Sequence, residues 1–145
     1  MQVKRLAVFV SGTGSNFLAV CDAIEKENIP AKIALVISSS AKALALNRAA
    51  QKGISTAVVD RATYPEQEQR QDAILSLLKD YNIDYCILAG YLAIVGPRII
   101  QEYRNRIINI HPSLIPSFCG QGYYGKRVHQ AVLDDFADLS GWEVY

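Results

Sequence analysis

Five apolar runs rich in β-branched residues alternate along this chain with stretches of helical periodicity. The runs that predict strands are residues 3–10, 32–38, 55–59, 85–89 and 106–110, and a sixth strand is expected to begin at 141–145. The stretches that predict helices are residues 16–27, 41–51, 63–80, 96–103 and 127–135. Because the strands are apolar on both faces, we expect an α/β fold, an open and mainly parallel sheet with helices on both faces.

Two of the expected helices begin at capping residues. Ser38, Ser39 and Ser40 are candidate N-caps for the helix at 41–51. Thr63 and Glu66 have the spacing of a capping box, which would open the following helix. These residues set where the two helices are expected to start.

The composition is that of a single compact domain covering residues 1–145. With 15 basic and 14 acidic residues the formal net charge is +1, which argues against nucleic acid or an anionic membrane surface as the main partner. No apolar run reaches the roughly 20 residues that a membrane helix needs. The 3 cysteines are far apart and form no C-x-x-C pair. We therefore expect no disulfide scaffold, no metal site and a cytoplasmic location.

The first strand is followed by the loop Ser11-Gly-Thr-Gly-Ser-Asn16. Its glycines allow a tight turn, and the backbone amides of Gly14, Ser15 and Asn16 would lie at a helix N-terminus, where the dipole favours an anion. Phe17 stands where a dinucleotide fingerprint needs its third glycine, and no P-loop lysine follows. The loop therefore predicts a small phosphate ester as ligand. The alternative is a well-capped tight turn with no ligand.

A second motif, Asn109-Ile-His-Pro-Ser-Leu-Ile-Pro116, follows the fifth strand. Side chains two residues apart on a strand face the same side, so Asn109 and His111 are expected to converge at the carboxyl edge of the sheet. Histidine exchanges a proton near neutral pH, and an asparagine amide donates to a developing oxyanion. The pair suits acyl transfer through a tetrahedral intermediate. The alternative is a histidine with a purely structural role.

Together these two motifs resemble the signatures of the phosphoribosylglycinamide formyltransferase family, and the likeness extends over residues 89–95 and 122–132. The resemblance implies a Rossmann-like formyltransferase fold. It also implies transfer of a formyl group from 10-formyltetrahydrofolate, a cosubstrate, to the amine of glycinamide ribonucleotide in purine biosynthesis. No metal is needed for that reaction.

The resemblance also implies a role for each matching residue. Gly14, Ser15 and Asn16 would hold the phosphate of the ribonucleotide. The folate would be bound by Leu92, Ala93, Ile94, Val95 and Asn109. Asn109 and His111 would stabilise the oxyanion, and His111 would also act as the acid.

Two departures from the family pattern are visible. The family carries a catalytic aspartate in a loop after the strand that 141–145 begins, and this sequence stops before that loop. We therefore expect the sheet to be incomplete at the C-terminus, ligand binding to be weak and turnover to be slow or absent. Where the family usually has a folate-contacting arginine, Glu68 occupies the expected position, and either Arg61 or Arg70 is a candidate replacement.

Two other functions remain open on the sequence alone. One is a non-catalytic remnant of the family that binds a phosphate ligand, and the other is a formyltetrahydrofolate hydrolase, in which water replaces the amine. An exposed sheet edge further predicts self-association.

Overall fold

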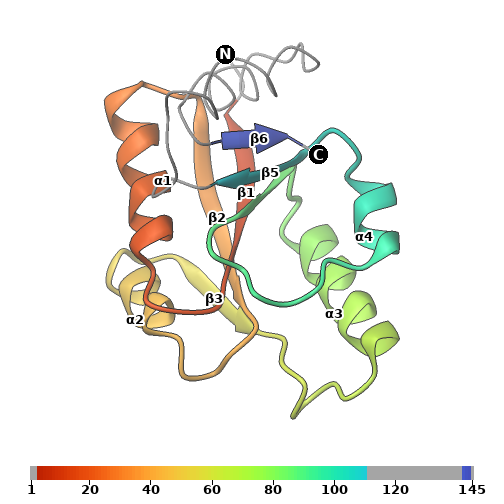
Figure 1. Ribbon diagram of the computed structural model, residues 1–145. Coiled ribbons are helices and arrows are strands. Elements are labelled where there is room, and N and C mark those ends of the chain that lie inside the picture. The colour runs from red at the N-terminus through yellow and green to blue at the C-terminus, as the bar shows by residue number, and fades with distance from the viewer. Residues whose placement is uncertain (1–2, 111–141, 145) are drawn as a thin grey trace.

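The computed structural model describes residues 3–110 and 142–144 (Figure 1). The strands are β1 (Lys4–Val10), β2 (Ala31–Ser38), β3 (Ser55–Val58), β4 (Tyr85–Leu88), β5 (Ile107–Ile110) and β6 (Trp142–Val144). The helices are α1 (Ser15–Lys26), α2 (Leu44–Gln51), α3 (Gln67–Asp80) and α4 (Pro97–Glu102). The strands form one six-stranded sheet in the order β3-β2-β1-β4-β5-β6. The pairs among β1 to β5 are parallel and β6 is antiparallel to β5, so the predicted open, mainly parallel sheet is confirmed.

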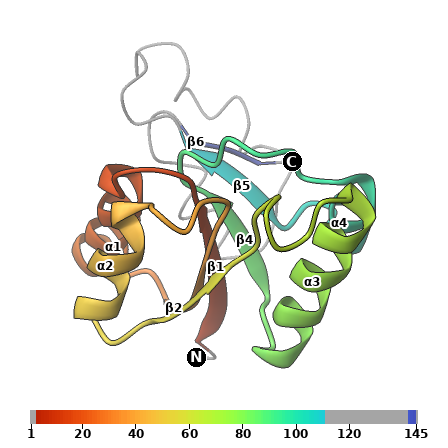
Figure 2. The ribbon, with the colours of Figure 1, turned by 90° about the horizontal axis from the view of Figure 1, so that it is seen from below.

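The helices cover both faces of the sheet, as predicted. Figures 1 and 2 show α1 and α2 on one side and α3 and α4 on the other. Alternate residues of β1 divide between the two cores: Leu6, Val8 and Val10 pack towards α1 and α2, whereas Ala7 and Phe9 pack towards α3 and α4. A central strand buried on both faces explains why its sequence is a continuous apolar run.

The predicted start of the second helix is wrong by three residues. The Ser38 hydroxyl donates to the Ser40 carbonyl over 2.7 Å and accepts the Ser40 backbone N–H over 3.0 Å. The serines after β2 therefore close a turn on one another, and α2 begins only at Leu44, with Ala43 as its N-cap. Serine side chains that bond the backbone two residues away are an alternative to helix capping, and here that alternative prevails.

The predicted capping box at Thr63 and Glu66 is also misplaced. Helix α3 begins at Gln67, and the Glu66 backbone N–H donates to Gln69 Oε1 over 3.0 Å. Thr63 instead donates its backbone N–H to Asp60 Oδ1 over 2.9 Å, inside the loop that follows β3. The box is thus shifted by three residues along the chain.

The structure describes the expected sixth strand, but not the segment between the fifth and sixth strands. The sixth strand forms as β6, with Asn109 of β5 opposite Glu143. The expected loop 111–125 and helix 127–135 lie outside the described residues. Among the helices of the described part, none has the length and apolar character required to cross a bilayer.

Candidate functional site

The carboxyl ends of the parallel strands bring several loops to one edge of the sheet. Residue 11 follows β1, residue 39 follows β2, residues 59–61 follow β3, and residues 89–95 follow β4. Ligands of open α/β sheets bind at this edge. Of the residues predicted for phosphate and folate binding, Asn109 lies on β5 and the others lie in or beside these loops.

The loop between β1 and α1 is held by backbone packing. Gly14 is the N-cap of α1 and has φ +91°, a left-handed conformation that favours glycine. A Cβ at this position would lie 2.9 Å from both Cα and Cβ of Ala45, and 3.1 Å from Cδ of Arg48. The Ala45 N–H also donates to the Gly12 carbonyl over 3.1 Å. The loop is therefore pressed against α2, which only a residue without a side chain permits.

This packing leaves the start of α1 without a capping side chain. The first backbone N–H to return into the helix is that of Leu18, which donates to the Gly14 carbonyl over 2.9 Å. The N–H groups of Gly14, Ser15, Asn16 and Phe17 precede it and have no partner within the helix. Four such amides at the positive end of the helix dipole can bind an anion such as phosphate.

The side chain of Asn16 lies against the end of β4. Gly90 has φ +76°, and a Cβ at this glycine would be 3.1 Å from Asn16 Nδ2. Asn16 is half-buried there. The asparagine therefore adjoins both predicted binding segments: its backbone belongs to the α1 start, and its side chain touches the strand end that leads into residues 91–95.

The segment 91–95, predicted to line the folate pocket, exposes much apolar surface. The side chains of Leu92 and Ile94 are 86% and 71% exposed, whereas Ala93 and Val95 are half-buried. At its start, the Tyr91 ring meets the Phe9 ring edge-on, with centroids 5.2 Å apart, and burial raises the pKa of the Tyr91 hydroxyl. Exposed apolar side chains on an anchored loop suit a flat heteroaromatic ligand.

The end of this segment is fixed by a buried glutamine of α3. Gln71 is 5% exposed, and its Oε1 accepts the Arg98 backbone N–H over 3.0 Å. Its side chain fills the space where a Cβ of Gly96 would lie. The guanidinium of Arg98 reinforces the contact through an ion pair of 2.6 Å with Asp72. Helix α3 thus sets where the loop ends and α4 begins.

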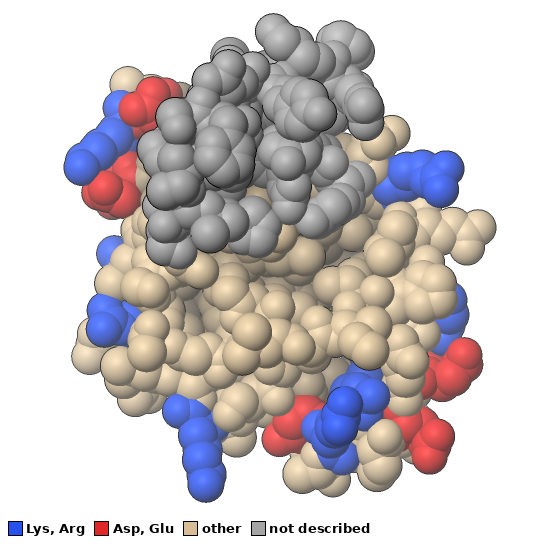
Figure 3. All heavy atoms as spheres, viewed as in Figure 1, with Lys and Arg blue, Asp and Glu red and all other residues tan. Residues whose placement is uncertain are grey.

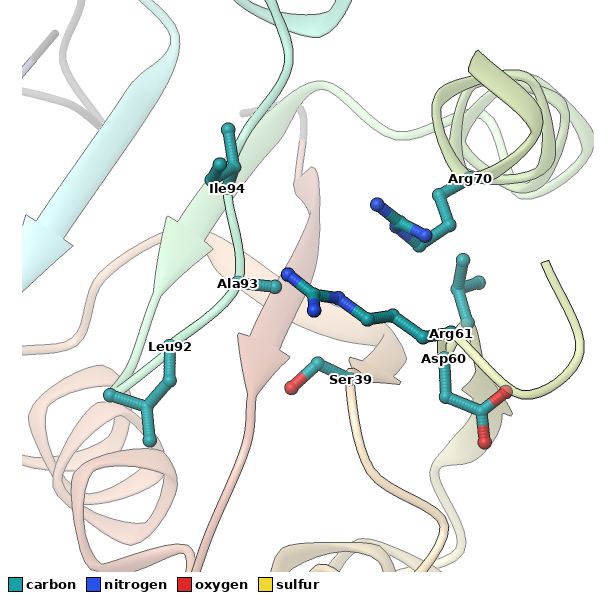
Figure 4. Close-up of a pocket in the computed structure, with 8 residues that line it drawn as sticks. Ser39, Asp60, Arg61, Arg70, Leu92, Ala93 and Ile94 are labelled. Carbon is teal, nitrogen blue, oxygen red and sulfur yellow. The ribbon is translucent and has the colours of Figure 1, made fainter. Parts of the chain in front are cut away.

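A cavity of about 360 Å³ opens beside residues 92–94, a volume within the range typical of small-molecule sites. Its lining consists of Ser39, Val59, Asp60, Arg61, Arg70, Leu92, Ala93 and Ile94. Figure 4 shows the Arg61 side chain extending across the cavity towards Ala93, while the Asp60 carboxylate turns away. The backbone N–H of Thr63 lowers the pKa of Asp60, which keeps that carboxylate ionised. One wall is therefore apolar and the other carries cationic groups.

The two arginines of this cavity differ in their commitments. Arg70 Nη1 donates to the carbonyls of Tyr64 and Pro65 over 2.7 and 2.9 Å. Arg61 is exposed and, within residues 3–110, makes no hydrogen bond or ion pair. Glu68, at the position expected for the family arginine, lies 3.8 Å from Arg98 of α4. Arg61 is therefore the arginine best placed to meet an anionic group of a ligand.

Charged residues elsewhere do not gather at one place on the visible face. Figure 3 shows Lys and Arg side chains interspersed with Asp and Glu around its rim, with uncharged residues in the middle. The charged groups that line the cavity itself are those of Arg61, Arg70 and Asp60.

Asn109, the predicted oxyanion donor, lies on β5 opposite Leu88 of β4. It is half-buried between Ile108 and Ile110, which both pack towards α1 and α2. By the alternation of a strand its side chain faces the α3 and α4 side. His111 lies outside the described residues, so its convergence with Asn109 stays a prediction.

The formyl transferase family matches residues 4–145 of this sequence. The chain belongs to this family. It is 40% identical to the phosphoribosylglycinamide formyltransferase of Haemophilus influenzae over 126 residues. These aligned residues cover 87% of this chain and 59% of that protein. The Bacillus subtilis phosphoribosylglycinamide formyltransferase is 34% identical over 130 residues, covering 90% of this chain and 67% of that protein.

Solved structures agree with this membership of the formyl transferase family. Glycinamide ribonucleotide transformylase 1 from Geobacillus kaustophilus matches with a TM-score of 0.72 and 40% identity, covering 83% of this chain and 64% of that one. The chain thus spans about three-fifths of the length of such relatives. The predicted family and the Rossmann-like formyltransferase fold are both confirmed.

In this member of the formyl transferase family, three residues support the site in a way that the sequence did not predict. Ser11 and Ser39 bond one another, Ser11 accepts a hydrogen bond from the loop after β4, and Gln71 fixes the end of that loop. A serine directly after each of two neighbouring strands was the available signal for the first two. Nothing in the sequence distinguishes the buried Gln71 from the exposed glutamines at 67 and 69 on the same helix.

Proposed function

We propose that this chain transfers the formyl group of 10-formyltetrahydrofolate to the amine of glycinamide ribonucleotide, in purine biosynthesis. The observation that carries the proposal is the adjacency of two complementary sites at one sheet edge. One is the start of α1, where Gly14 is the N-cap and no side chain caps the backbone N–H groups. The other is a cavity lined by residues 92–94 and Arg61. An anionic ribonucleotide and a folate are ligands of these two chemical kinds. The relatives from Haemophilus influenzae and Bacillus subtilis are both named phosphoribosylglycinamide formyltransferase, which supports the proposal.

The ribonucleotide phosphate would bind at the start of α1. The backbone N–H groups of Gly14, Ser15 and Asn16 would donate to its oxygens, and that of Phe17 completes the set. The packing of Gly14 on Ala45 supports this assignment, because it holds these amides in place before any ligand arrives.

The folate would occupy the cavity beside residues 92–95. The exposed side chains of Leu92 and Ile94 would cover the flat ring, with Ala93 and Val95 beside them. Arg61, which extends across the cavity, would bind the carboxylates at the other end of the folate through charge-assisted hydrogen bonds. The Leu92 N–H is bonded to Ser11, so backbone bonds to the ring would come from the later residues of the segment.

The chemical step needs few groups. The amine nitrogen attacks the formyl carbon and forms the new C–N bond, and the carbonyl oxygen gains negative charge. Asn109 would donate its side-chain amide to that oxygen, and His111 would assist it. As the intermediate collapses, the bond from carbon to the folate nitrogen breaks. That nitrogen takes a proton from His111, and the proton that the amine loses returns to His111, so that the histidine is regenerated.

The proposal extends to location and assembly. We expect the chain to work in the cytoplasm, where both ligands would be available to it. We also propose self-association through β6, which lies at the edge of the sheet next to β5. A mass measured by light scattering that stays at one chain up to high concentration would contradict the assembly part alone.

A formyl-transfer assay tests the proposed activity. The chain is mixed with 10-formyltetrahydrofolate and glycinamide ribonucleotide, and the formylated ribonucleotide is measured by mass spectrometry. Product that requires both ligands supports the proposal. Formate release without the amine would instead identify a hydrolase, and ligand binding with neither product would identify a non-catalytic binding protein.

A matched pair of variants ties the activity to the site. Asn109→Asp replaces the amide donor by a carboxylate of equal size, and should lower kcat by roughly a hundredfold or more. Asn47→Asp makes the same change at an exposed position of α2 and should leave the rate unaltered. Equal rates for the two variants would remove Asn109 from the mechanism.

A further inference from the structure

One hydroxyl group joins the two loops of the candidate site. The Leu92 backbone N–H donates to Ser11 Oγ over 2.8 Å, and the hydroxyls of Ser11 and Ser39 lie 2.5 Å apart. Ser11 follows β1 and directly precedes Gly12, whereas Leu92 opens the exposed apolar part of the loop after β4. The ends of three neighbouring strands, β2, β1 and β4, therefore meet at this side chain.

The hydrogen-bonding capacity of serine fits this position. A hydroxyl has one donor and two acceptor sites, so Ser11 can accept from Leu92 and still bond Ser39. Ser39 is itself fixed, because its backbone N–H donates to the Val10 carbonyl over 3.1 Å. The Ser11 hydroxyl is thus oriented from the β2 side and holds the loop on the β4 side.

The segment 91–95 has few other attachments. Tyr91 contacts Phe9 at its start, and Gln71 binds just beyond its end. Within the described residues, the bond from Leu92 to Ser11 is the only hydrogen bond made by the backbone of 91–95. The hydrogen bonding between the backbone of this segment and the loop before α1 therefore depends on one side chain.

We propose that Ser11 is a positioning residue that couples the two binding sites, so that a ligand at either one raises the affinity for a ligand at the other. The inference rests on the function proposed above. Gly14 is held by its packing, but Gly12 and Thr13, which join it to Ser11, are exposed. An anion bound at the amides of α1 restrains these two residues and, with them, Ser11. The ordered hydroxyl then holds Leu92, and so residues 92–94, in the conformation that lines the cavity. Coupling of this kind is reciprocal by thermodynamic necessity.

Calorimetric titration measures this coupling without chemistry. Tetrahydrofolate lacks the formyl group, so it can be titrated into the 145-residue chain in the absence and presence of saturating glycinamide ribonucleotide. We expect its Kd to fall about fivefold or more when the ribonucleotide is present. In Ser11→Ala that ratio should drop to about one, while the affinity for the ribonucleotide alone changes by less than about twofold.

Ser39→Ala is the matched control. It removes a hydroxyl from the same contact but leaves Ser11 Oγ to accept the Leu92 N–H, so most of the coupling should remain. Hydrogen exchange gives a second readout: the Leu92 amide should exchange more slowly in the parent chain when ribonucleotide is added, and this slowing should be absent in Ser11→Ala.

The outcomes separate this inference from the proposed function. If both ligands bind the parent chain but their affinities are independent, or if Ser11→Ala keeps the parent ratio, the coupling role is overturned and the proposed function stands. If neither ligand binds the parent chain, the proposed function fails and the inference falls with it. Should Ser11→Ala fail to fold, exchange of the Leu92 amide in the parent chain decides, because Ser11 Oγ is its acceptor. Slower exchange with ribonucleotide supports the role of Ser11, and unchanged exchange overturns it.

Discussion

The loops after β1 and after β4 lie at the same sheet edge but are held in different ways. The first is fixed by its backbone: Gly14 packs on Ala45, and the Gly12 carbonyl accepts a hydrogen bond from α2. The second is anchored near its ends and through Ser11, and it leaves Leu92 and Ile94 exposed. The first loop therefore has its binding shape built into the fold. The second keeps apolar surface that only a ligand would cover. Substitutions should accordingly affect folding at the first loop and binding at the second.

The largest effect is expected at Gly14. Gly14→Ala places a methyl group 2.9 Å from Ala45 and forces a non-glycine residue to φ +91°. Strain and overpacking together should lower the free energy of unfolding by about 3 kcal/mol. Urea unfolding monitored by circular dichroism measures the change. Gly12→Ala is the control, since a Cβ there meets nothing within 4 Å, and it should cost far less. Equal losses for the two variants would mean that the loop is not held by packing on α2.

A smaller loss of stability is expected at Gln71, which supports the second loop from outside it. Gln71→Leu removes the acceptor of the Arg98 N–H and leaves that donor without its partner, which should cost about 2 kcal/mol in unfolding free energy. It should also weaken tetrahydrofolate binding, because the end of segment 91–95 is no longer fixed. Gln67→Leu, at the exposed first residue of the same helix, should be close to neutral. A neutral Gln71→Leu would show that α3 does not set the loop.

The smallest of the three effects is expected at Arg61, whose substitution should change ligand binding and leave stability unchanged. Arg61→Gln removes an exposed cation without disturbing a hydrogen bond, so stability should hold while tetrahydrofolate affinity falls roughly tenfold, or about 1.4 kcal/mol. Arg70→Gln should instead reduce stability, because Arg70 holds the carbonyls of Tyr64 and Pro65. Calorimetry and urea unfolding distinguish these outcomes. The reverse pattern would make Arg70 the folate contact.

The sequence predicted the sheet and the glycine loop well because both depend on local pattern. Continuous apolar runs require strands buried on two faces, and the glycines in Ser11-Gly-Thr-Gly-Ser-Asn16 match the left-handed turn at Gly14. Helix starts were predicted less well, because the serines after β2 form hydrogen bonds within a turn and do not cap the helix. Which of the two they form depends on where β2 ends relative to its neighbouring strands, and the sequence pattern does not give that position.

The support of the site was not predictable, because it depends on long-range contacts. Ser11 and Leu92 are 81 residues apart, and Gln71 and Arg98 are 27 apart. Each pair meets only because parallel strands and their helices bring distant segments to the same edge. The different hydrogen bonding of Arg61 and Arg70, on which the proposal for Arg61 rests, likewise became visible only in the structure.

The central claim is that two different ligands share the carboxyl edge of this sheet, one on each loop. Backbone amide shift mapping of the nitrogen-15-labelled chain tests it most directly. Glycinamide ribonucleotide should shift the amides of residues 14–17, and tetrahydrofolate should shift those of residues 91–95. Shifts confined to the opposite edge, around Arg5 and Lys32, or identical shifts from both ligands, would contradict the account.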